Sequence, residues 1–299
     1  SWGTVLGKVY AALFPEHVGS FVLDGAVDLT LPSTTMTFQQ AQGFEKALDR
    51  FTAWCAKQRA FVLGGTASQA KARLVQFVRD LDAHPMRTDN PQRRFTEAQA
   101  ITAIIGPMYI GQDGWQWLLD ALVPALTVGN AQSLQTINDW FIERGDNGVY
   151  GSNANTAIYF MNCFDSRGSI TSVAKAKQYA TTWSKKLPFM GAAMAWSDLP
   201  CANWPYHATT DIHTLTVKDV PPALVEDSTY DPATPLAWSM GLAAQWPGAV
   251  LLVHDGDGHT SYDTRSKCID TAIDAFLMSD DYLHPTLPAN GTTCDATTV

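Results

Sequence analysis

The sequence predicts an α/β fold in which one parallel sheet is interrupted by a large helical insertion. Short apolar runs alternate with helical segments at both ends of the chain, whereas the region between them shows helical periodicity almost throughout. The 299 residues are 46% apolar, which is enough to bury a sizeable core. One alternating pattern on both sides of an insertion favours a single sheet over three independent domains. The expected segments are 1–30, 31–215 and 216–299.

Residues 1–30 are predicted to form a turn, a helix and the first strand. Val5 and Val9 lie one helical turn apart on an apolar face, and Pro15 ends that helix. The apolar run 20–26 suits a parallel strand that is buried on both faces. These residues therefore belong to the sheet half of the protein.

Residues 31–215 are predicted to form a helical cap with almost no strand. Polar stretches and breaks that contain Gly or Pro separate segments of helical periodicity. The expected helices are 38–58, 68–81, 96–105, 114–126, 131–144, 154–165 and 172–186.

Residues 216–299 return to an alternation of strands and helices. We expect strands at 222–226 and 249–254, each followed by a helix, at 235–245 and 266–277, and then an irregular tail. Together with the strand at 20–26, this gives about three parallel strands.

Composition and charge exclude several classes of function. The net charge is −9 without any cluster of Lys or Arg, which argues against a nucleic-acid partner. The apolar windows 100–111 and 115–129 fall below the roughly 18 uncharged residues of a membrane-spanning helix, so no membrane partner is expected. Cys and His do not cluster at metal-ligand spacing, and no metal or other cofactor is implied.

The five cysteines suggest two local disulfides. Cys163 and Cys201 bracket a helical stretch, Cys268 and Cys294 bracket the C-terminal segment, and Cys55 is left over. This arrangement indicates an oxidising compartment and, with the low content of charged residues, a secreted protein. The alternative is a cytosolic protein with five reduced thiols.

The first residues have the pattern of a nucleophile elbow. Ser1, Trp2 and Gly3 precede a helix rich in small residues and match the second half of the motif G-x-S-x-G. In such an elbow the serine projects from a sharp turn at a helix N-terminus, where the next amide can stabilise negative charge. Ser1 is therefore a candidate nucleophile, and the Trp2 amide a candidate oxyanion donor.

The later part of the chain offers the two partners that such a serine needs. Asp231 follows the expected strand 222–226, and His259 lies in a Gly-rich loop after the strand 249–254. A carboxylate can orient an imidazole, which then takes the proton of the serine. The order Ser, Asp, His is that of the α/β-hydrolases. Asp227 is a rival acid, and we expect His254 to have a structural role.

Several segments together resemble one family, the secreted tripeptidyl aminopeptidases. These are α/β-hydrolases that are related to proline iminopeptidases and carry a TAP-like C-terminal domain. The resemblance covers the whole chain in the same order. The similar segments are SWGTVLG at 1–7, YAALFP at 10–15, VLDG at 22–25, NCFD at 162–165, LPC at 199–201, WP at 204–205, DPATP at 231–235, GH at 258–259, and the tail between Cys268 and Cys294.

The resemblance implies a nucleophile at Ser1, an acid at Asp231 and a base at His259. It also implies disulfides Cys163–Cys201 and Cys268–Cys294, and a secreted exopeptidase that releases short peptides or amino acids from a free N-terminus through an acyl-enzyme. An exopeptidase of this kind needs an anion for the ammonium group of its substrate. The candidates in the cap are Asp165, Asp139 and Glu143.

Two alternative functions remain open. An esterase or lactonase would use the same three residues on small esters and would need no carboxylate for an amine. A non-catalytic subunit of a cleaved hydrolase would act only as a binding partner.

The family fold places several strands before the elbow, and this sequence contains none of them. We therefore expect the chain to be the C-terminal piece of a longer precursor that works in complex with the N-terminal fragment. That fragment would cover the hydrophobic edge of the sheet beside the elbow. Self-cleavage by the Ser1 hydroxyl is one origin for such a break, and cleavage by another protease is the alternative.

Overall fold

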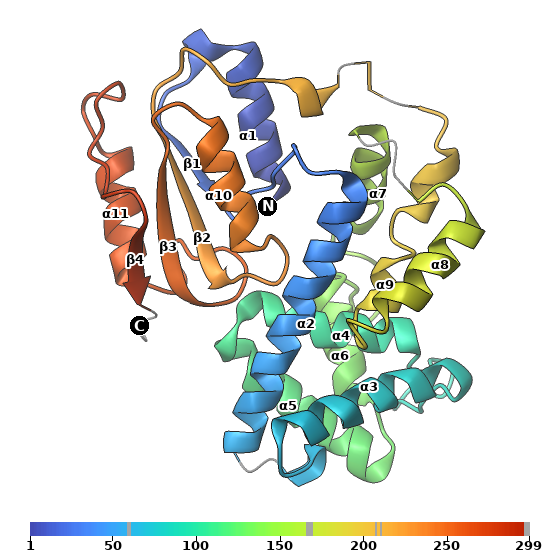
Figure 1. Ribbon diagram of the computed structural model, residues 1–299. Coiled ribbons are helices and arrows are strands. Elements are labelled where there is room, and N and C mark those ends of the chain that lie inside the picture. The colour runs from blue at the N-terminus through green and yellow to red at the C-terminus, as the bar shows by residue number, and fades with distance from the viewer. Residues whose placement is uncertain (59–60, 166–169, 207, 210, 296–299) are drawn as a thin grey trace.

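The structure, a computed structural model, comprises a sheet half and a helical cap (Figure 1). It describes residues 1–295 except 59–60, 166–169, 207 and 210. The chain enters the sheet half first, passes through the cap, and returns to complete the sheet. The cap is therefore an insertion into one sheet, which is the α/β architecture that the sequence predicts.

Four parallel strands form the sheet in the order β1-β2-β3-β4. Their bounds are β1 Phe21–Asp24, β2 Ala223–Tyr230, β3 Val250–Asp257 and β4 Thr292–Asp295. The cap lies between β1 and β2 in the sequence, yet these two strands are direct neighbours, with Asp24 opposite Glu226. The insertion thus leaves the sheet continuous.

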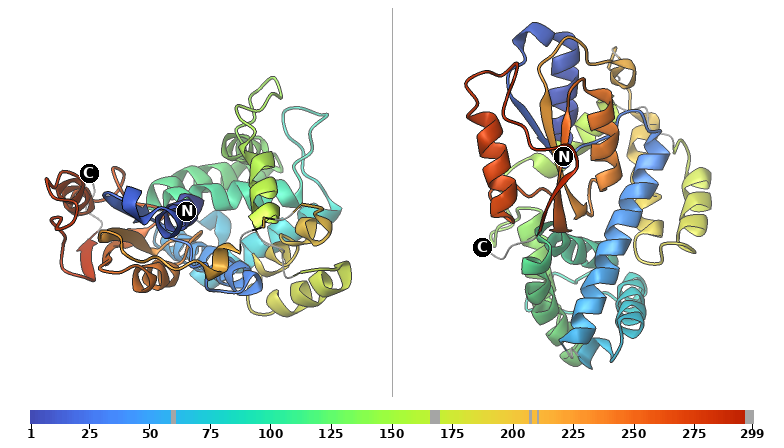
Figure 2. Two further views of the ribbon diagram at one scale, coloured as in Figure 1. Left: turned by 90° about the horizontal axis from the view of Figure 1, so that it is seen from above. Right: turned by 60° about the vertical axis from the view of Figure 1, so that its left-hand side comes forward.

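Three helices cover the two faces of the sheet (Figure 2). Helices α1 (Trp2–Leu13) and α10 (Leu236–Gln245) pack on one face, where Leu23 and Val225 are buried. Helix α11 (Lys267–Leu277) packs on the other face, against Leu224 and Leu252. Burial on both faces is typical of parallel strands and explains their near-continuous apolar sequence.

The cap is helical and has a core of its own. All seven expected helices are present, with boundaries that differ by a few residues. Phe51, Leu74, Ile104 and Leu118 are fully buried in the core of the cap. The helices are α2 Ser33–Lys57, α3 Ala67–Ala83, α4 Glu97–Ile110, α5 Gln112–Val128, α6 Gln132–Phe141, α7 Ala154–Asp165, α8 Val173–Trp183 and the short α9 Gly191–Met194.

Four short 3₁₀ turns complete the secondary structure of the described residues. One follows α1, and the other three connect helices or lead back to the sheet. They are Pro15–His17, Phe61–Leu63, Leu199–Asn203 and Ile212–Thr214.

Two elements differ from the sequence prediction. Helix α4 does not end at Ile105 but continues through Gly106 and Pro107 to Ile110. An internal proline disfavours a helix, but Gly106, Pro107 and Met108 are buried, so packing holds this stretch in place. The tail predicted to be irregular contains β4. Asn290 Oδ1 accepts from the Leu251 amide, and the Gly291 amide donates to the Leu251 carbonyl, which aligns the tail with β3.

Two disulfides form between the pairs that the sequence suggested. Cys163–Cys201 joins α7 to the turn Leu199–Asn203, and Cys268–Cys294 joins α11 to β4. Loops of 38 and 26 residues correspond to about 4 kcal/mol of stabilisation each in the chain-entropy description. Cys55 is a free, buried thiol whose pKa is raised to about 12 by burial.

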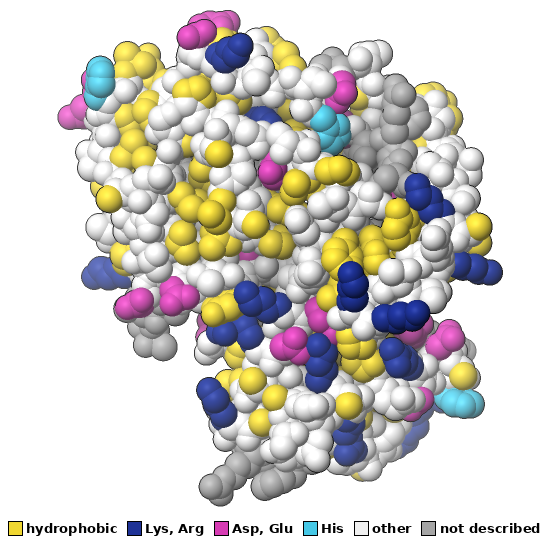
Figure 3. Space-filling model, in the orientation of Figure 1, with side chains coloured by type: hydrophobic (Ala, Val, Ile, Leu, Met, Phe, Trp, Pro, Cys, Tyr) yellow, Lys and Arg dark blue, Asp and Glu magenta, His cyan; other side chains and the backbone are white. Residues whose placement is uncertain are grey.

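Figure 3 shows that Lys and Arg side chains over the cap are interspersed with Asp and Glu rather than gathered into a basic patch. Among the helices described here, none is both long and apolar enough to cross a membrane.

The outer edge of β1 pairs with no strand among the described residues. The neighbouring helix α1 and the residue that follows it expose four large apolar side chains, between 39% and 69% of their surface: Leu6, Tyr10, Leu13 and Phe14. An open, apolar strand edge is a place where further polypeptide can pair.

Candidate active site

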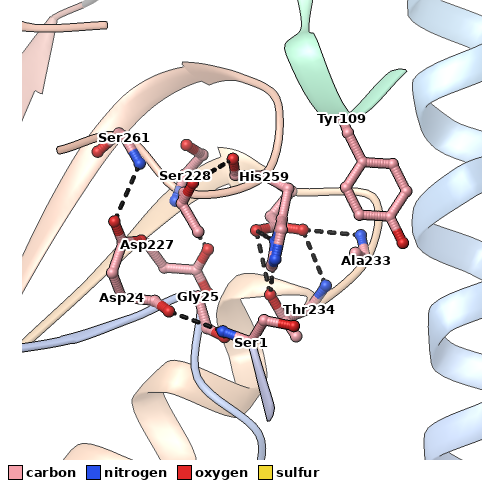
Figure 4. Close-up of polar contacts among 12 residues, drawn as sticks. Ser1, Asp24, Gly25, Tyr109, Asp227, Ser228, Ala233, Thr234, His259 and Ser261 are labelled. Carbon is pink, nitrogen blue, oxygen red and sulfur yellow. Dashed lines mark hydrogen bonds and ion pairs between the residues drawn. The ribbon is translucent and has the colours of Figure 1, made fainter. Parts of the chain in front are cut away.

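Asp231 and His259 meet at the carboxyl ends of two neighbouring strands. β2 ends at Tyr230 and β3 at Asp257, so each residue follows the end of its strand. His259 Nδ1 lies 2.7 Å from Asp231 Oδ2 (Figure 4). The aspartate side chain is fully buried and that of the histidine is 10% exposed. This is the geometry in which a carboxylate orients an imidazole.

Backbone and side-chain donors fix the Asp231 carboxylate. Its Oδ1 accepts from the amides of Ala233 at 2.7 Å and Thr234 at 2.8 Å. Its Oδ2 accepts from the Thr234 hydroxyl at 3.1 Å, and this hydroxyl also lies 3.2 Å from His259 Nδ1. Oδ1 is therefore bonded to the backbone of the loop after β2, and Oδ2 faces the imidazole of His259.

Ser1 lies beside this pair at the N-terminus of α1 (Figure 4). Its amino group donates to the carbonyl oxygens of Asp24 at 2.8 Å and Gly25 at 2.5 Å, which fixes Ser1 against the end of β1. No hydrogen bond joins the Ser1 hydroxyl to His259, as is common for catalytic contacts before substrate binds. Burial lowers the pKa of the amino group, and the charges of Asp24 and Asp231 oppose this effect.

The position directly after β1 requires a glycine, Gly25. Its φ of 61° lies in the left-handed region, and a Cβ atom there would come within 2.9 Å of His259 Cε1 and 3.0 Å of Thr234 Oγ1. A larger residue would push the imidazole away from Asp231.

The Trp2 amide belongs to the first turn of α1. The amides of a first turn have no partner within their helix and can donate to a negative group at its N-terminus. This is consistent with the oxyanion role that the sequence suggested for Trp2.

Tyr109, which the sequence analysis missed, is the cap residue in contact with His259. Its carbonyl accepts from the His259 amide at 2.9 Å, and its ring meets the imidazole edge to face at 5.4 Å. Burial, and to a lesser degree the charge of Asp231, raises the pKa of the phenol to about 12, so it stays neutral. Sequence reasoning missed it because helix α4 was expected to end at Ile105.

Charged side chains tie the cap to the loop that carries His259. Arg265 donates to the carbonyls of Tyr109, at 2.8 Å, and Ile110. Arg50 of α2 forms a two-pronged ion pair with Asp257 and stacks on the Tyr230 ring. Asp257 therefore joins the end of β3 to α2, and the cap forms one wall of the site.

The rival residues have other partners. Asp227 accepts from the hydroxyl of Ser239 at 2.6 Å and from the Ser228 amide at 2.8 Å, and it does not contact His259. His254 is buried, and its Nδ1 lies 2.9 Å from the Ser228 hydroxyl. Both side chains are therefore bonded to other residues of the sheet half and not to His259.

The three candidate amine-binding residues lie in different surroundings. Asp139 is paired with Arg93 through contacts of 2.6 and 2.9 Å, so its charge is already neutralised, which argues against that role. Glu143 is an exposed residue with a left-handed φ of 55° in the loop after α6. Asp165 ends α7 and is partly buried; burial raises its pKa, and His213 lowers it.

The described residues contain no group of three or more His, Cys, Asp or Glu side chains arranged to hold a metal ion. The polar groups that converge on the site are those of Ser1, Asp231, Thr234 and His259.

The fold and the site together define an α/β-hydrolase: a parallel sheet, a helical insertion, and Ser, Asp and His gathered at the carboxyl edge of the strands. Residues 187–294 match the family model of the TAP-like proteins. This part of the chain is therefore a TAP-like segment. The match begins within the segment 31–215 that the sequence analysis assigned to the cap.

Three relatives show the range of this family. The chain is 32% identical to serine protease Hip1 of Mycobacterium tuberculosis, over 98% of this chain and 56% of the relative. It is 31% identical to the tripeptidyl aminopeptidase of Streptomyces lividans, over 93% and 51%. It is 30% identical to carboxylesterase B of Mycobacterium tuberculosis, over 91% and 52%. The chain thus spans about half the length of the curated relatives it matches.

Proposed function

We propose that this protein is a serine hydrolase in which Ser1 is the nucleophile, His259 the general base and Asp231 the residue that orients it. The observation that carries the proposal is the contact of 2.7 Å between Asp231 and His259 beside the N-terminus of α1, where Ser1 lies. The names serine protease, tripeptidyl aminopeptidase and carboxylesterase among the relatives support the same class.

The proposed reaction begins when His259 Nε2 takes the proton of the Ser1 hydroxyl while Asp231 holds Nδ1. The Ser1 oxygen attacks the substrate carbonyl, and the Trp2 amide donates to the oxyanion. His259 then gives the proton to the leaving group, which departs and leaves an acyl-enzyme on Ser1. A water molecule, activated by His259, hydrolyses that ester and restores the serine.

Covalent labelling tests this proposal. A fluorophosphonate reagent should add one phosphonyl group to the full-length, natively purified protein, and peptide mapping should locate it on Ser1. An unlabelled protein would contradict the proposal and favour the non-catalytic binding subunit.

We further propose that the substrate is a peptide with a free N-terminus and that Asp165 binds its ammonium group. Asp139 is paired with Arg93, and Glu143 lies exposed on the loop after α6. Asp165 is partly buried at the end of α7, which Figure 1 shows at the level of Ser1, away from α3 and α5. The helix also exposes Ile158, Phe160 and Phe164 by about half, which suits contact with a peptide.

The variant Asp165→Asn tests the amine site. For a peptide with a free N-terminus we expect KM to rise about 10-fold or more, because a hydrogen-bonded ion pair is worth about 1.5–3 kcal/mol. For the N-acetylated peptide and for a small ester, KM should not change. Glu143→Gln, on the exposed loop after α6, is the matched control. Equal KM changes for both peptides would exclude Asp165 as the amine site.

The alternative is an esterase or lactonase, which the relative named carboxylesterase B favours. It would use the same three residues. Small esters would then be hydrolysed faster than any peptide, and acetylation of a peptide N-terminus would make no difference.

We also propose that the protein is extracellular and that polypeptide outside these 299 residues completes the sheet. Two disulfides support an oxidising compartment. The open edge of β1 and the exposed apolar residues of α1 support a further strand and helix at that edge. Intact-mass spectrometry of the natively purified material should show this polypeptide, either in the same chain or co-eluting as a separate one.

A further inference from the structure

Two carboxyl groups lie side by side beneath the loop that carries His259. Asp24 of β1 and Glu226 of β2 are direct partners in the register of the sheet, so their side chains emerge on the same face. Glu226 is fully buried, and so is Asp24 Oδ1. Within the part of the chain that the structure describes, neither residue forms an ion pair with a Lys or Arg side chain. Two ionised carboxylates in this position would repel each other strongly.

The hydrogen bonds around the two groups leave one oxygen on each without a donor. Asp24 Oδ2 accepts from the amides of Ser261 and Tyr262, and Glu226 Oε1 accepts from the Ser261 hydroxyl at 2.5 Å. Asp24 Oδ1 and Glu226 Oε2 are buried and have no donor from any other described residue. Buried polar oxygens are rarely left unsatisfied. One proton between these two atoms satisfies both.

The electrostatic surroundings assign that proton to Glu226. Burial, followed by the hydrogen bond to Asp24 and the charge of Asp24, raises the pKa of Glu226 to about 11. The Ser261 hydroxyl opposes the shift. Glu226 is therefore the donor of the shared proton, and Asp24 Oδ1 is its acceptor.

The loop held by this pair, residues 258–263, is strained. Thr260, directly after His259, has a φ of 61°, and Asp263 has a φ of 58°. The left-handed region is unfavourable for a β-branched residue such as threonine and persists only where the surroundings enforce it. Ser261 and Tyr262, which the pair anchors, lie between these two strained positions.

We propose that Asp24 and Glu226 share one proton and that this pair anchors the His259 loop, which makes both of them positioning residues for the catalytic base. Two ionised carboxylates would separate and release Ser261. With one proton the pair accepts three hydrogen bonds from the loop and holds the backbone that directs His259 toward Asp231. The inference rests on the proposed role of His259.

Other titratable groups surround the pair. They are the amino group of Ser1 on α1, Asp227 on β2, His254 on β3, and Arg265 and Asp231 in the flanking loops. Asp270 and Asp274 of α11 bind the outer end of the loop, at the Asp263 amide and the Tyr262 hydroxyl. None of them forms a hydrogen bond to Asp24 Oδ1 or Glu226 Oε2.

Two substitutions of Glu226 by residues of similar size distinguish the effect of its hydrogen bonds from the effect of its packing. Glu226→Gln has the shape of a protonated glutamate and can donate to Asp24 while it accepts from Ser261. Glu226→Leu can do neither. In the full-length protein we expect the kcat of E226Q to lie within about 3-fold of the wild-type value. The kcat of E226L should fall at least 10-fold below the wild-type value, with little change in KM.

The control for general loss of stability is Glu45→Ala. Glu45 is a buried carboxylate in the cap that accepts from the amides of Phe189 and Met190 and does not touch the His259 loop. This variant should lower Tm yet leave kcat unchanged. If E226L and E45A have the same kcat, Glu226 is not a positioning residue.

The pH dependence of stability tests the shared proton itself. The pKa of Glu226 is raised in the folded state, so its contribution to stability is full below the pKa of the unfolded chain, about 4.3, and is lost as pH rises toward 11. E226Q has no such proton to lose. The Tm of E226Q minus that of the wild type should therefore increase steadily from pH 5 to pH 9.

Each outcome decides a separate claim. A Tm difference that does not vary with pH would show that Glu226 is ionised and would overturn the shared proton. Equal kcat for E226L, E226Q and the wild type would overturn the anchoring role. A wild-type protein that a fluorophosphonate does not label would instead refute the proposed function, and it would leave the Tm measurement interpretable.

Discussion

Replacement of Ser1 by alanine in the full-length protein is expected to lower kcat by about 10⁶-fold and to abolish labelling by a fluorophosphonate. Removal of the nucleophile of a Ser-His-Asp site leaves only the contribution of the oxyanion hole and of substrate binding. Single-turnover hydrolysis of the best substrate measures the loss.

The fold should survive this change. The Ser1 hydroxyl makes no capping hydrogen bond to α1, so Tm should change little. Ser184→Ala, which removes a hydroxyl bonded to a helix carbonyl in the cap, is the matched control and should keep full activity. Retained activity in S1A would assign the nucleophile elsewhere, and the Ser1 proposal would fail.

Replacement of Asp231 by asparagine is expected to lower kcat by about 10⁴-fold, the effect known for triads of this type. The structure supplies the reason. Oδ1 of residue 231 must accept from the amides of Ala233 and Thr234, so an asparagine would direct its NH₂ group at His259 Nδ1. The imidazole would then carry its proton on Nε2 and could not take a proton from Ser1.

Asp227→Asn is the matched control for this prediction. Asparagine keeps the shape of the Asp227 side chain, which is bonded to Ser239 and Ser228 rather than to His259, and burial, followed by the charge of Asp231, raises the pKa of Asp227 well above its usual value. We expect a change in kcat of less than about 3-fold. A large effect of D227N together with a small effect of D231N would make Asp227 the orienting acid.

The residues of the site differ in how far sequence could predict them. Ser1, Asp231 and His259 were predictable because each is tied to a local signal: small residues after a serine, and polar residues after short apolar strands. Asp231 was preferred to Asp227 by its distance from the strand. The structure adds the reason, because Asp227 lies within β2 and points to α10, whereas Asp231 follows the strand and faces His259.

Tyr109 and the pair Asp24–Glu226 could not be predicted from sequence. Tyr109 reaches His259 only because α4 continues through Pro107, which local rules treat as a break. Asp24 and Glu226 are about 200 residues apart along the chain and become neighbours only through the register of β1 and β2. The choice among the candidate amine-binding carboxylates likewise needed the pairing of Asp139 with Arg93.

By itself the sequence predicted most of the architecture: local periodicity of apolar residues indicated the long helices and the strands β1, β2 and β3, and their alternation indicated a parallel sheet with a helical cap. Strand β4 is defined only by its pairing with β3. Only the tertiary structure decided which polar groups touch and which carboxyl groups are neutral. Those properties depend on distance and burial between residues that are remote in the chain, and no local pattern of sequence contains either quantity.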